Sequence, residues 1–107
     1  MTTDTKLISN AFMAFNDEAP KHAESWRNLV NSLAEASALD PKTHSLAYIS
    51  VLAALNRVNG IPFHVKMAKN HGATRDEIIS AILVGLPPAG HLVTEALPAA
   101  IKEFDKA

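Results

Sequence analysis

The chain contains no cysteine, and this absence removes several classes of function at once. Disulfide bonds, thiolate zinc sites and thiol redox catalysis all need cysteine sulfur, so none of them is available to this sequence. Aromatic residues make up only 6% of the chain, although hydrophobic residues make up 48%. The core must therefore consist of leucine, isoleucine, valine and alanine, as in a helical protein.

Neither charge nor hydrophobicity is concentrated enough to indicate a nucleic-acid or membrane partner. Ten basic residues nearly balance eleven acidic ones, and the net charge of −1 lacks the basic excess of a nucleic-acid surface. No apolar run approaches the roughly 20 residues of a membrane span. The N-terminal residues also lack the pattern of a signal peptide. We therefore expect a cytoplasmic protein with no nucleic-acid and no membrane partner.

The length and the spacing of apolar residues predict one helical domain. A chain of 107 residues has the usual size of a single domain, which we expect to span residues 1–107. Apolar residues recur at spacings of three and four, which is the helical period, and no useful stretch alternates as a strand does. The sequence therefore predicts an all-α fold, a single compact domain of five to six helices.

Proline and polar capping residues mark where several helices begin. Asp40-Pro41 predicts one start, because aspartate accepts a bond from a free backbone N–H and proline has no N–H to leave unpaired. Thr74-x-x-Glu77 has the spacing of a capping box. Pro20 and Pro62 are expected to open two further helices, because proline fits the first helical turn.

Other residues mark where the helices end. Asn59-Gly60 predicts a break, because both residues tolerate left-handed backbone. Gly72 predicts the end of the short helix that carries His64, and Pro87-Pro88 predicts the end of the fifth helix. The outer helices are expected through Leu7–Phe15, capped by Thr3 or Asp4, and through Leu92–Phe104, bent at Pro98.

The helix expected at Pro41–Val58 differs from the others because it is apolar on nearly every side. From Leu46 to Leu55 its only polar residue is Ser50, which we expect to bond back to its own helix. A helix of this kind is normally surrounded on all sides, and a chain of this length supplies few neighbours for it. We therefore expect subunit contacts to cover the remaining surface, as in a homo-oligomer.

His64 and Arg57 are the residues best suited to carry chemistry. His64 is expected in the first turn of a helix, where the helix dipole favours the neutral imidazole, which can accept or relay a proton. Arg57 is expected at the end of the central helix, where its guanidinium can clamp a carboxylate. Each residue also has a structural interpretation. His64 would then bond a backbone carbonyl, and Arg57 would face the helix dipole as an ordinary cation.

The histidines do not have the spacing of a metal site. His64 and His71 lie two helical turns apart, and His44 and His91 are expected on separate helices, whereas a metal site needs three or four converging donors. There is also no nucleophile elbow, phosphate loop or dinucleotide fingerprint. We therefore assign no metal and no cofactor, but spacing along the chain does not show whether the histidines converge in space, so a metal site stays open as a minor alternative.

Five short motifs within residues 40–92 form a larger pattern. They read Thr43-x-Ser45-Leu46, Ala54-Leu55-x-Arg57, His64-Val65 with Ala68, Asn70-x-Gly72-x-Thr74-x-Asp76-Glu77-Ile78, and Ala89-Gly90. This set resembles the carboxymuconolactone decarboxylase family of the alkylhydroperoxidase-D-like superfamily. The resemblance implies an alkylhydroperoxidase-D-like fold around the central helix, assembled as a homotrimer or a homohexamer.

Two branches of that superfamily imply different chemistry. The peroxidase branch carries Cys-x-x-Cys-x-x-x-His, and alignment on His64 places its cysteines at Arg57 and Gly60. The decarboxylase branch, which the chain resembles better, removes CO₂ from a carboxylated lactone. That branch tends to carry an acidic residue, an arginine and a tyrosine where this chain has Gly60, His44 and Pro88. The resemblance implies that His64 is catalytic and that Arg57 and His44 bind a small carboxylate.

Two functions from different classes remain open. One is a cofactor-free lyase or proton-transfer enzyme that acts on a small carboxylate or lactone. The other is a catalytically inactive helical oligomer that serves as a small-molecule binding or assembly module. A polar pocket joining His64, Arg57 and His44 would favour the enzyme. A pocket filled by the side chains of Ile61, Phe63 and Leu86 would favour the module.

The absence of cysteine generates a prediction that needs no structure. We expect the metal-free and haem-free protein to lack thiol peroxidase activity, because no thiolate is present to attack a peroxide. Consumption of an alkyl hydroperoxide can be followed with and without the protein. Catalytic turnover above the buffer control would contradict the prediction.

Overall fold

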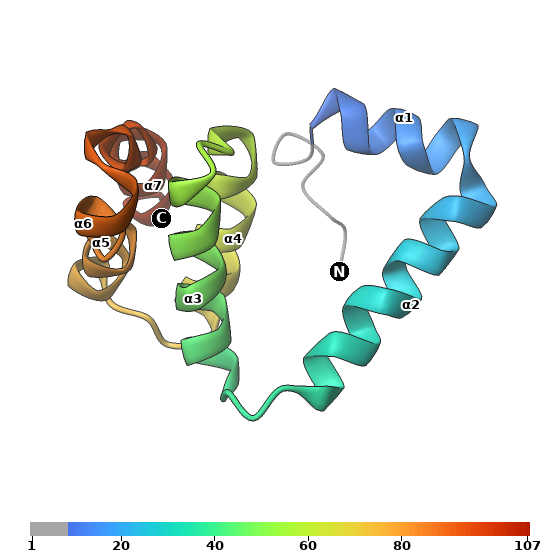
Figure 1. The fold of residues 1–107 in the computed structure, drawn as a ribbon, viewed down its shortest axis with the longest axis horizontal. Coiled ribbons are helices and arrows are strands. Elements are labelled where there is room, and N and C mark those ends of the chain that lie inside the picture. Colours follow the sequence, from blue (N-terminus) through green and yellow to red (C-terminus); the bar gives the residue numbers. More distant parts are fainter. Residues whose placement is uncertain (1–8) are drawn as a thin grey trace. The chain divides into compact units, whose positions relative to one another are not determined.

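The computed structural model describes residues 9–107, and this part of the chain contains helices and no strand (Figure 1). The all-α class predicted from the sequence is therefore confirmed. The elements are α1 (Asn10–Glu18), α2 (Pro20–Ala36), α3 (Pro41–Ala54), η2 (Val58–Gly60), α4 (Ile61–Asn70), α5 (Arg75–Leu83), α6 (Leu86–Ala89), η3 (His91–Ala96) and α7 (Leu97–Phe104), of which η2 and η3 are 3₁₀ helices.

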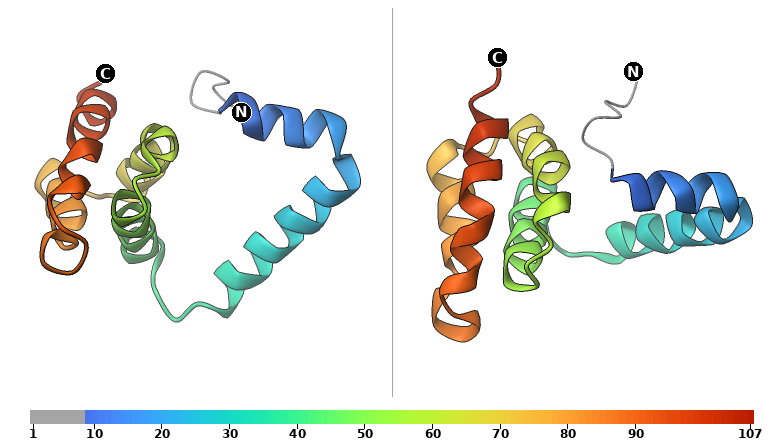
Figure 2. Two further views of the ribbon diagram at one scale, coloured as in Figure 1. Left: turned by 45° about the horizontal axis from the view of Figure 1, so that its top comes forward. Right: turned by 90° about the horizontal axis from the view of Figure 1, so that it is seen from above.

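Contacts between residues divide the chain into two compact units, residues 1–39 and residues 40–107. The clustered hydrophobic core and every candidate functional residue belong to the second unit. There α3 packs against α4 and α5, and α7 packs against the same two helices. Figure 2 shows η3 and α7 running alongside the α3–α4 pair. This packing places α3 and α4 side by side, and these two helices carry the candidate site.

The described part of the first unit, residues 9–39, contains the two helices α1 and α2. The Ser9 hydroxyl caps α1 by accepting a hydrogen bond from the Phe12 N–H at 3.1 Å. Pro20 opens α2, as the sequence predicts. The cap predicted at Thr3 or Asp4 lies outside the described residues.

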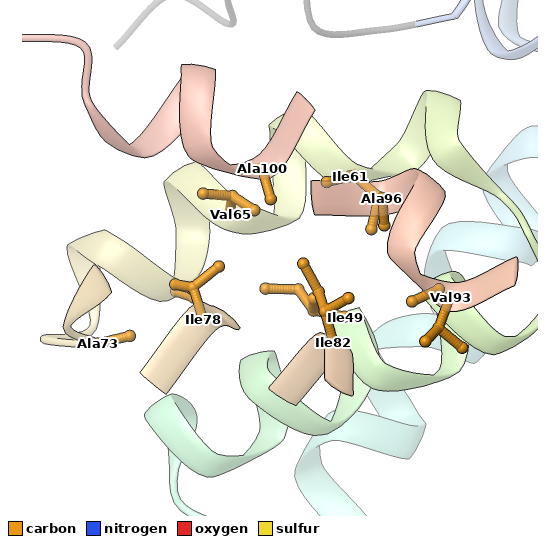
Figure 3. Close-up of a cluster of buried hydrophobic side chains, with 11 residues drawn as sticks. Ile49, Ile61, Val65, Ala73, Ile78, Ile82, Val93, Ala96 and Ala100 are labelled. Carbon is orange, nitrogen blue, oxygen red and sulfur yellow. The ribbon is translucent and has the colours of Figure 1, made fainter. Parts of the chain in front are cut away.

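The core of the second unit is aliphatic, as the low aromatic content predicts (Figure 3). Each of the helices α3, α4, α5 and α7 contributes side chains to it, and so does η3. The largest fully buried side chains are Ile49, Ile61, Ile78, Ile82, Val65 and Val93.

Within the second unit, α3 is covered on one side only. Ile49 and Ala53 are buried in the core, whereas Val51 and Leu55 remain 57% and 63% exposed. The Ser50 hydroxyl lies within hydrogen-bond distance of the Leu46 carbonyl of its own helix, at 3.1 Å, as predicted, but it lies closer to the Ala81 carbonyl on α5, at 2.6 Å. The remaining apolar surface of α3 is the part that subunit contacts were expected to cover.

The central helix is shorter than the sequence predicts. α3 ends at Ala54 and not at Val58, because the chain turns at Asn56, which has the left-handed φ of +55°. The break predicted at Asn59-Gly60 is therefore wrong by about one turn. Gly60 has an ordinary φ of −85° and leads from η2 directly into α4. Asparagine tolerates left-handed backbone better than most residues, so Asn56 can end the helix without a glycine.

Most of the other predicted boundaries are confirmed. Asp40 caps α3 by accepting from the Thr43 N–H at 3.2 Å. Gly72 has a φ of +94° directly after α4, where a left-handed residue commonly ends a helix. Thr74 and Glu77 form the predicted capping box, with reciprocal hydrogen bonds of 3.1 Å and 2.9 Å.

The prolines near the C-terminus act differently from the prediction. α5 ends at Leu83, and Pro87-Pro88 lies inside the short helix α6 instead of ending the fifth helix. Pro98 lies in the first turn of α7, where it separates α7 from η3 instead of bending one long helix. In both places proline occupies a first turn, where its missing N–H costs no hydrogen bond.

No helix in the described part of the chain is both long enough and apolar enough to cross a membrane. The cytoplasmic location expected from the sequence stays a prediction. The expected single domain of residues 1–107 also stays a prediction, because residues 1–8 lie outside the described part of the chain.

The left-handed turn after α3 generates a prediction about stability. Asn56→Ala is expected to lower the free energy of unfolding by roughly 1 kcal/mol, because alanine tolerates left-handed backbone less well than asparagine. Asn59→Ala is the matched control, because Asn59 lies in η2 and has no positive φ. Urea unfolding at one protein concentration measures both variants. Equal losses in the two would contradict the turn at Asn56.

Candidate functional site

His64 lies in the first turns of α4, as the sequence predicts. Its neighbours Ile61 and Val65 point into the core and are completely buried. Successive helical residues are about 100° apart, so His64 falls at the edge of the buried face and is itself half-buried. The ring therefore lies between the aliphatic core and the solvent.

The ring of Tyr48 on α3 stacks against the imidazole of His64. The two ring centroids are 4.0 Å apart and the planes differ by 18°, so the faces of the rings are in contact. Phe63 approaches the same imidazole edge-on, with centroids 5.2 Å apart. The sequence analysis missed Tyr48, because no spacing rule pairs a residue on one helix with a histidine on another.

His44 extends this group of rings along α3. It lies one helical turn before Tyr48, and the two ring centroids are 6.4 Å apart. Its positive form also acts electrostatically on His64. The structure therefore brings His44, Tyr48 and His64 together, and we call these three residues the His–Tyr–His cluster.

The environment of His64 keeps its imidazole neutral. Two causes together lower the pKa of His64 from 6.5 to about 4: burial, which removes hydration from the charged form and is the larger cause, and the nearby His44. The His64 ring makes no hydrogen bond with any described residue. Every fully buried side-chain nitrogen in the described chain has a hydrogen-bond partner, so the nitrogens of the His64 ring are not fully buried. The ring nitrogens therefore reach solvent. The structural interpretation, in which His64 bonds a backbone carbonyl, finds no such bond in the described chain.

Arg57 lies outside the helices, in the turn between α3 and η2. Its side chain is exposed and forms neither an ion pair nor a hydrogen bond with any described residue. No contact joins it to the His–Tyr–His cluster. The expectation that it ends the central helix is wrong, because α3 stops three residues earlier. The structure thus brings together His44 and His64, and no hydrogen bond, ion pair or ring contact among the described residues joins Arg57 to either of them.

A surface groove lies elsewhere, between α3 and α5, with an open volume of about 410 Å³. Its lining includes Ser50 and Glu77 but none of the predicted site residues. Ser50 donates across the groove floor to the Ala81 carbonyl at 2.6 Å. Glu77 caps α5 and pairs with Lys42 at 3.0 Å. These polar groups hold the helices together. The pocket expected to join His64 with Arg57 and His44 is not this groove.

Three histidines lie outside the cluster, and one of them, His22, is an exposed residue of α2 in the first unit. His71 ends α4 and His91 begins η3, and both side chains are exposed. Among residues 9–107, no group of three or more histidine, cysteine, aspartate or glutamate side chains has the geometry to hold a metal ion.

The chain was compared with models of protein families. The model of the carboxymuconolactone decarboxylase family matches residues 20–102, which is more than half of the chain. The matched range runs from α2 into α7 and includes the His–Tyr–His cluster. No curated protein and no solved structure matches the chain.

The low pKa of His64 generates a prediction about pH. Between pH 6.5 and pH 4 the unfolded chain binds a proton at His64 and the folded chain does not, so acid favours unfolding. His64→Gln removes this proton uptake. The free energy of unfolding of wild type, relative to this variant, should therefore fall by about 1–2 kcal/mol as the pH is lowered from 6.5 to 4. This is less than the full pKa shift would give, because the ring is partly exposed.

Urea unfolding near the two ends of the window tests this at one protein concentration. His91→Gln on η3 is the matched control, because it replaces an exposed histidine outside the cluster. A stability difference between wild type and His64→Gln that does not change with pH would contradict the buried, neutral His64.

Proposed function

The chain belongs to the carboxymuconolactone decarboxylase family, and on that premise we propose that it is a cofactor-free lyase or proton-transfer enzyme acting on a small carboxylate or lactone. The environment of His64 is the observation that supports the proposal. His64 is half-buried and neutral, its ring nitrogens make no hydrogen bond with the described residues, and a second histidine, His44, lies nearby. A neutral imidazole at the edge of an apolar core is a group that can exchange protons with a bound molecule.

The proposed role of His64 is that of a proton shuttle. When a carboxylate leaves as CO₂, the bond between the carboxylate and the neighbouring carbon breaks. The electron pair of that bond stays on the neighbouring carbon, which then takes up a proton. An imidazole with a low pKa is a weak base, but its protonated form returns the proton readily. An anionic substrate beside His64 would raise that pKa toward the working pH, because it stabilises the charged ring.

Arg57 and His44 are proposed as the residues that bind the substrate carboxylate. Arg57 is exposed and forms no ion pair with the described residues, so its guanidinium is available for a bidentate contact. His44 belongs to the cluster and occupies the position where the decarboxylases tend to carry arginine. The backbone N–H groups of Phe63 and His64, in the first turn of α4, would add affinity for an anion.

The alternative function is a binding or assembly module that has lost catalysis. Two observations favour it: the groove beside α3 does not include His64, and Gly60 lacks the acidic side chain of the decarboxylases. Packing does not force that glycine. An added Cβ would meet Leu52 at 3.4 Å, an ordinary contact, and the φ of Gly60 is acceptable for any residue.

Either function is proposed to operate in a homotrimer or a homohexamer. Large apolar side chains remain exposed on both units, including Trp26 and Leu33 on α2, Val51 on α3 and Leu55 directly after α3. Their burial between subunits would remove apolar surface from water. Light scattering at micromolar concentration should return three or six times the 11.5 kDa mass of one chain. Leu55→Glu should weaken the assembly, and a monomeric wild type would contradict it.

Substitution of the proposed site residues tests the enzyme directly. His64→Gln is expected to lower the rate of CO₂ release from a carboxylated lactone by roughly 10²-fold or more, because the proton shuttle is lost. Arg57→Ala is expected mainly to weaken binding, by about tenfold. Both variants should keep the fold when they are checked by thermal melting.

Each variant has a matched control that makes the same chemical change elsewhere. His91→Gln on η3 and Lys102→Ala on α7 replace exposed side chains outside the cluster, and they should behave as wild type. If His64→Gln binds and turns over every tested carboxylate as wild type does, the enzyme is excluded and the module becomes the better account.

A further inference from the structure

The stacking of Tyr48 on His64 has a consequence for how the imidazole is held. The rings lie 4.0 Å apart with nearly parallel planes, so Tyr48 covers one face of the imidazole. The side chain of Tyr48 is itself 38% exposed, which places the stack at the surface of the α3–α4 pair. A ring contact of this closeness restricts the rotation of the imidazole about its Cβ–Cγ bond.

No hydrogen bond fixes the orientation of His64. Histidines that act in proton transfer are usually oriented by a carboxylate or a carbonyl that bonds the second ring nitrogen. The described residues supply no such partner to His64. Ring contacts from Tyr48 and Phe63 are therefore the interactions that hold its plane, and of these only Tyr48 stacks face to face.

We propose that Tyr48 is the positioning residue of His64 and replaces the usual hydrogen-bonded partner with a stacked ring. The stack holds both imidazole nitrogens in a plane parallel to the tyrosine ring, where neither can donate into its π face. Both nitrogens then stay open to an incoming molecule. The importance of this position for catalysis rests on the proposed function, whereas the orientation itself does not.

The effect of the Tyr48 ring on His64 can be separated from the effect of nearby charge. His44 on α3 is the group whose charge acts on His64, and desolvation is the larger cause of the lowered pKa. Loss of the tyrosine ring would admit water to one imidazole face and leave His44 in place. Loss of the hydroxyl alone would leave the stack intact, since the Tyr48 hydroxyl makes no hydrogen bond with a described residue.

Nuclear magnetic resonance of the histidine ring protons tests the orientation. In wild type, the ring protons of His64 should be shifted upfield by the Tyr48 ring current. Ordinary shifts there would overturn the proposal without any substitution. Tyr48→Phe should keep both the upfield shift and the low pKa. Tyr48→Ala should lose the shift and raise the pKa of His64 by roughly one unit or more, toward its ordinary value.

Phe63→Leu is the matched control, because it removes the other aromatic contact of His64 and leaves the stack. Its effect on the pKa of His64 should be smaller than that of Tyr48→Ala. Equal effects from Phe63→Leu and Tyr48→Ala, or a Tyr48→Phe variant that behaves like Tyr48→Ala, would overturn the special role of the stack.

Kinetics with a carboxylated lactone test the catalytic consequence. Tyr48→Ala should lower kcat about tenfold with little change in KM, because misplacing a proton-transfer group affects the chemical step more than binding. Tyr48→Phe, which keeps the stacked ring, should have the kcat of wild type. An unchanged kcat in Tyr48→Ala would overturn the positioning role. If wild type shows no turnover at all, the proposed function fails, whereas the resonance measurements still decide the orientation of His64.

Discussion

The burial of one face of α3 is the constraint on which the candidate site depends. Ser45, Ile49 and Ala53 are four residues apart and all point inward, which fixes the rotation of the helix about its axis. His44 and Tyr48 each precede one of these residues, so both fall on the same flank of α3. The core thus determines where these two rings point, although neither belongs to it.

The same reasoning applies to α4 and explains why three rings meet. Ile61, Val65 and Ala68 face the core, and His64 lies on the flank beside them. Because α3 and α4 pack side by side, their flanks come together and Tyr48 stacks on His64. The small aliphatic core has a second effect. It removes water from one side of the imidazole and thereby lowers the pKa of His64.

The sequence predicted those parts of the fold that depend on local chemistry. Asp40, Gly72 and the Thr74–Glu77 capping box act on backbone groups within a few residues, so their roles could be predicted without tertiary contacts. The end of α3 could not be located in this way, because Asn56 and Asn59-Gly60 are both acceptable stops. Packing of the following turn against α3 distinguishes them, and the sequence does not contain that information in a local form.

The candidate site was predictable only in part for the same reason. His64 was identifiable from its place in a helix start and from the family resemblance, and its half-burial follows from the buried residues beside it. Tyr48 was not identifiable, because its role arises from the register between two helices. Arg57 was assigned by spacing along the chain, but the left-handed turn takes it out of the helix, and no contact joins it to His64.

If the proposed function is correct, small ligands bind at the His–Tyr–His cluster and not at the α3–α5 groove. Chemical-shift mapping of the wild-type protein with a series of small carboxylates and lactones distinguishes the two places. We expect the largest shift changes to fall on Tyr48 and His64 as the ligand is added. Changes centred on Ser50 and Glu77 in the groove, or no saturable change at either place, would contradict it.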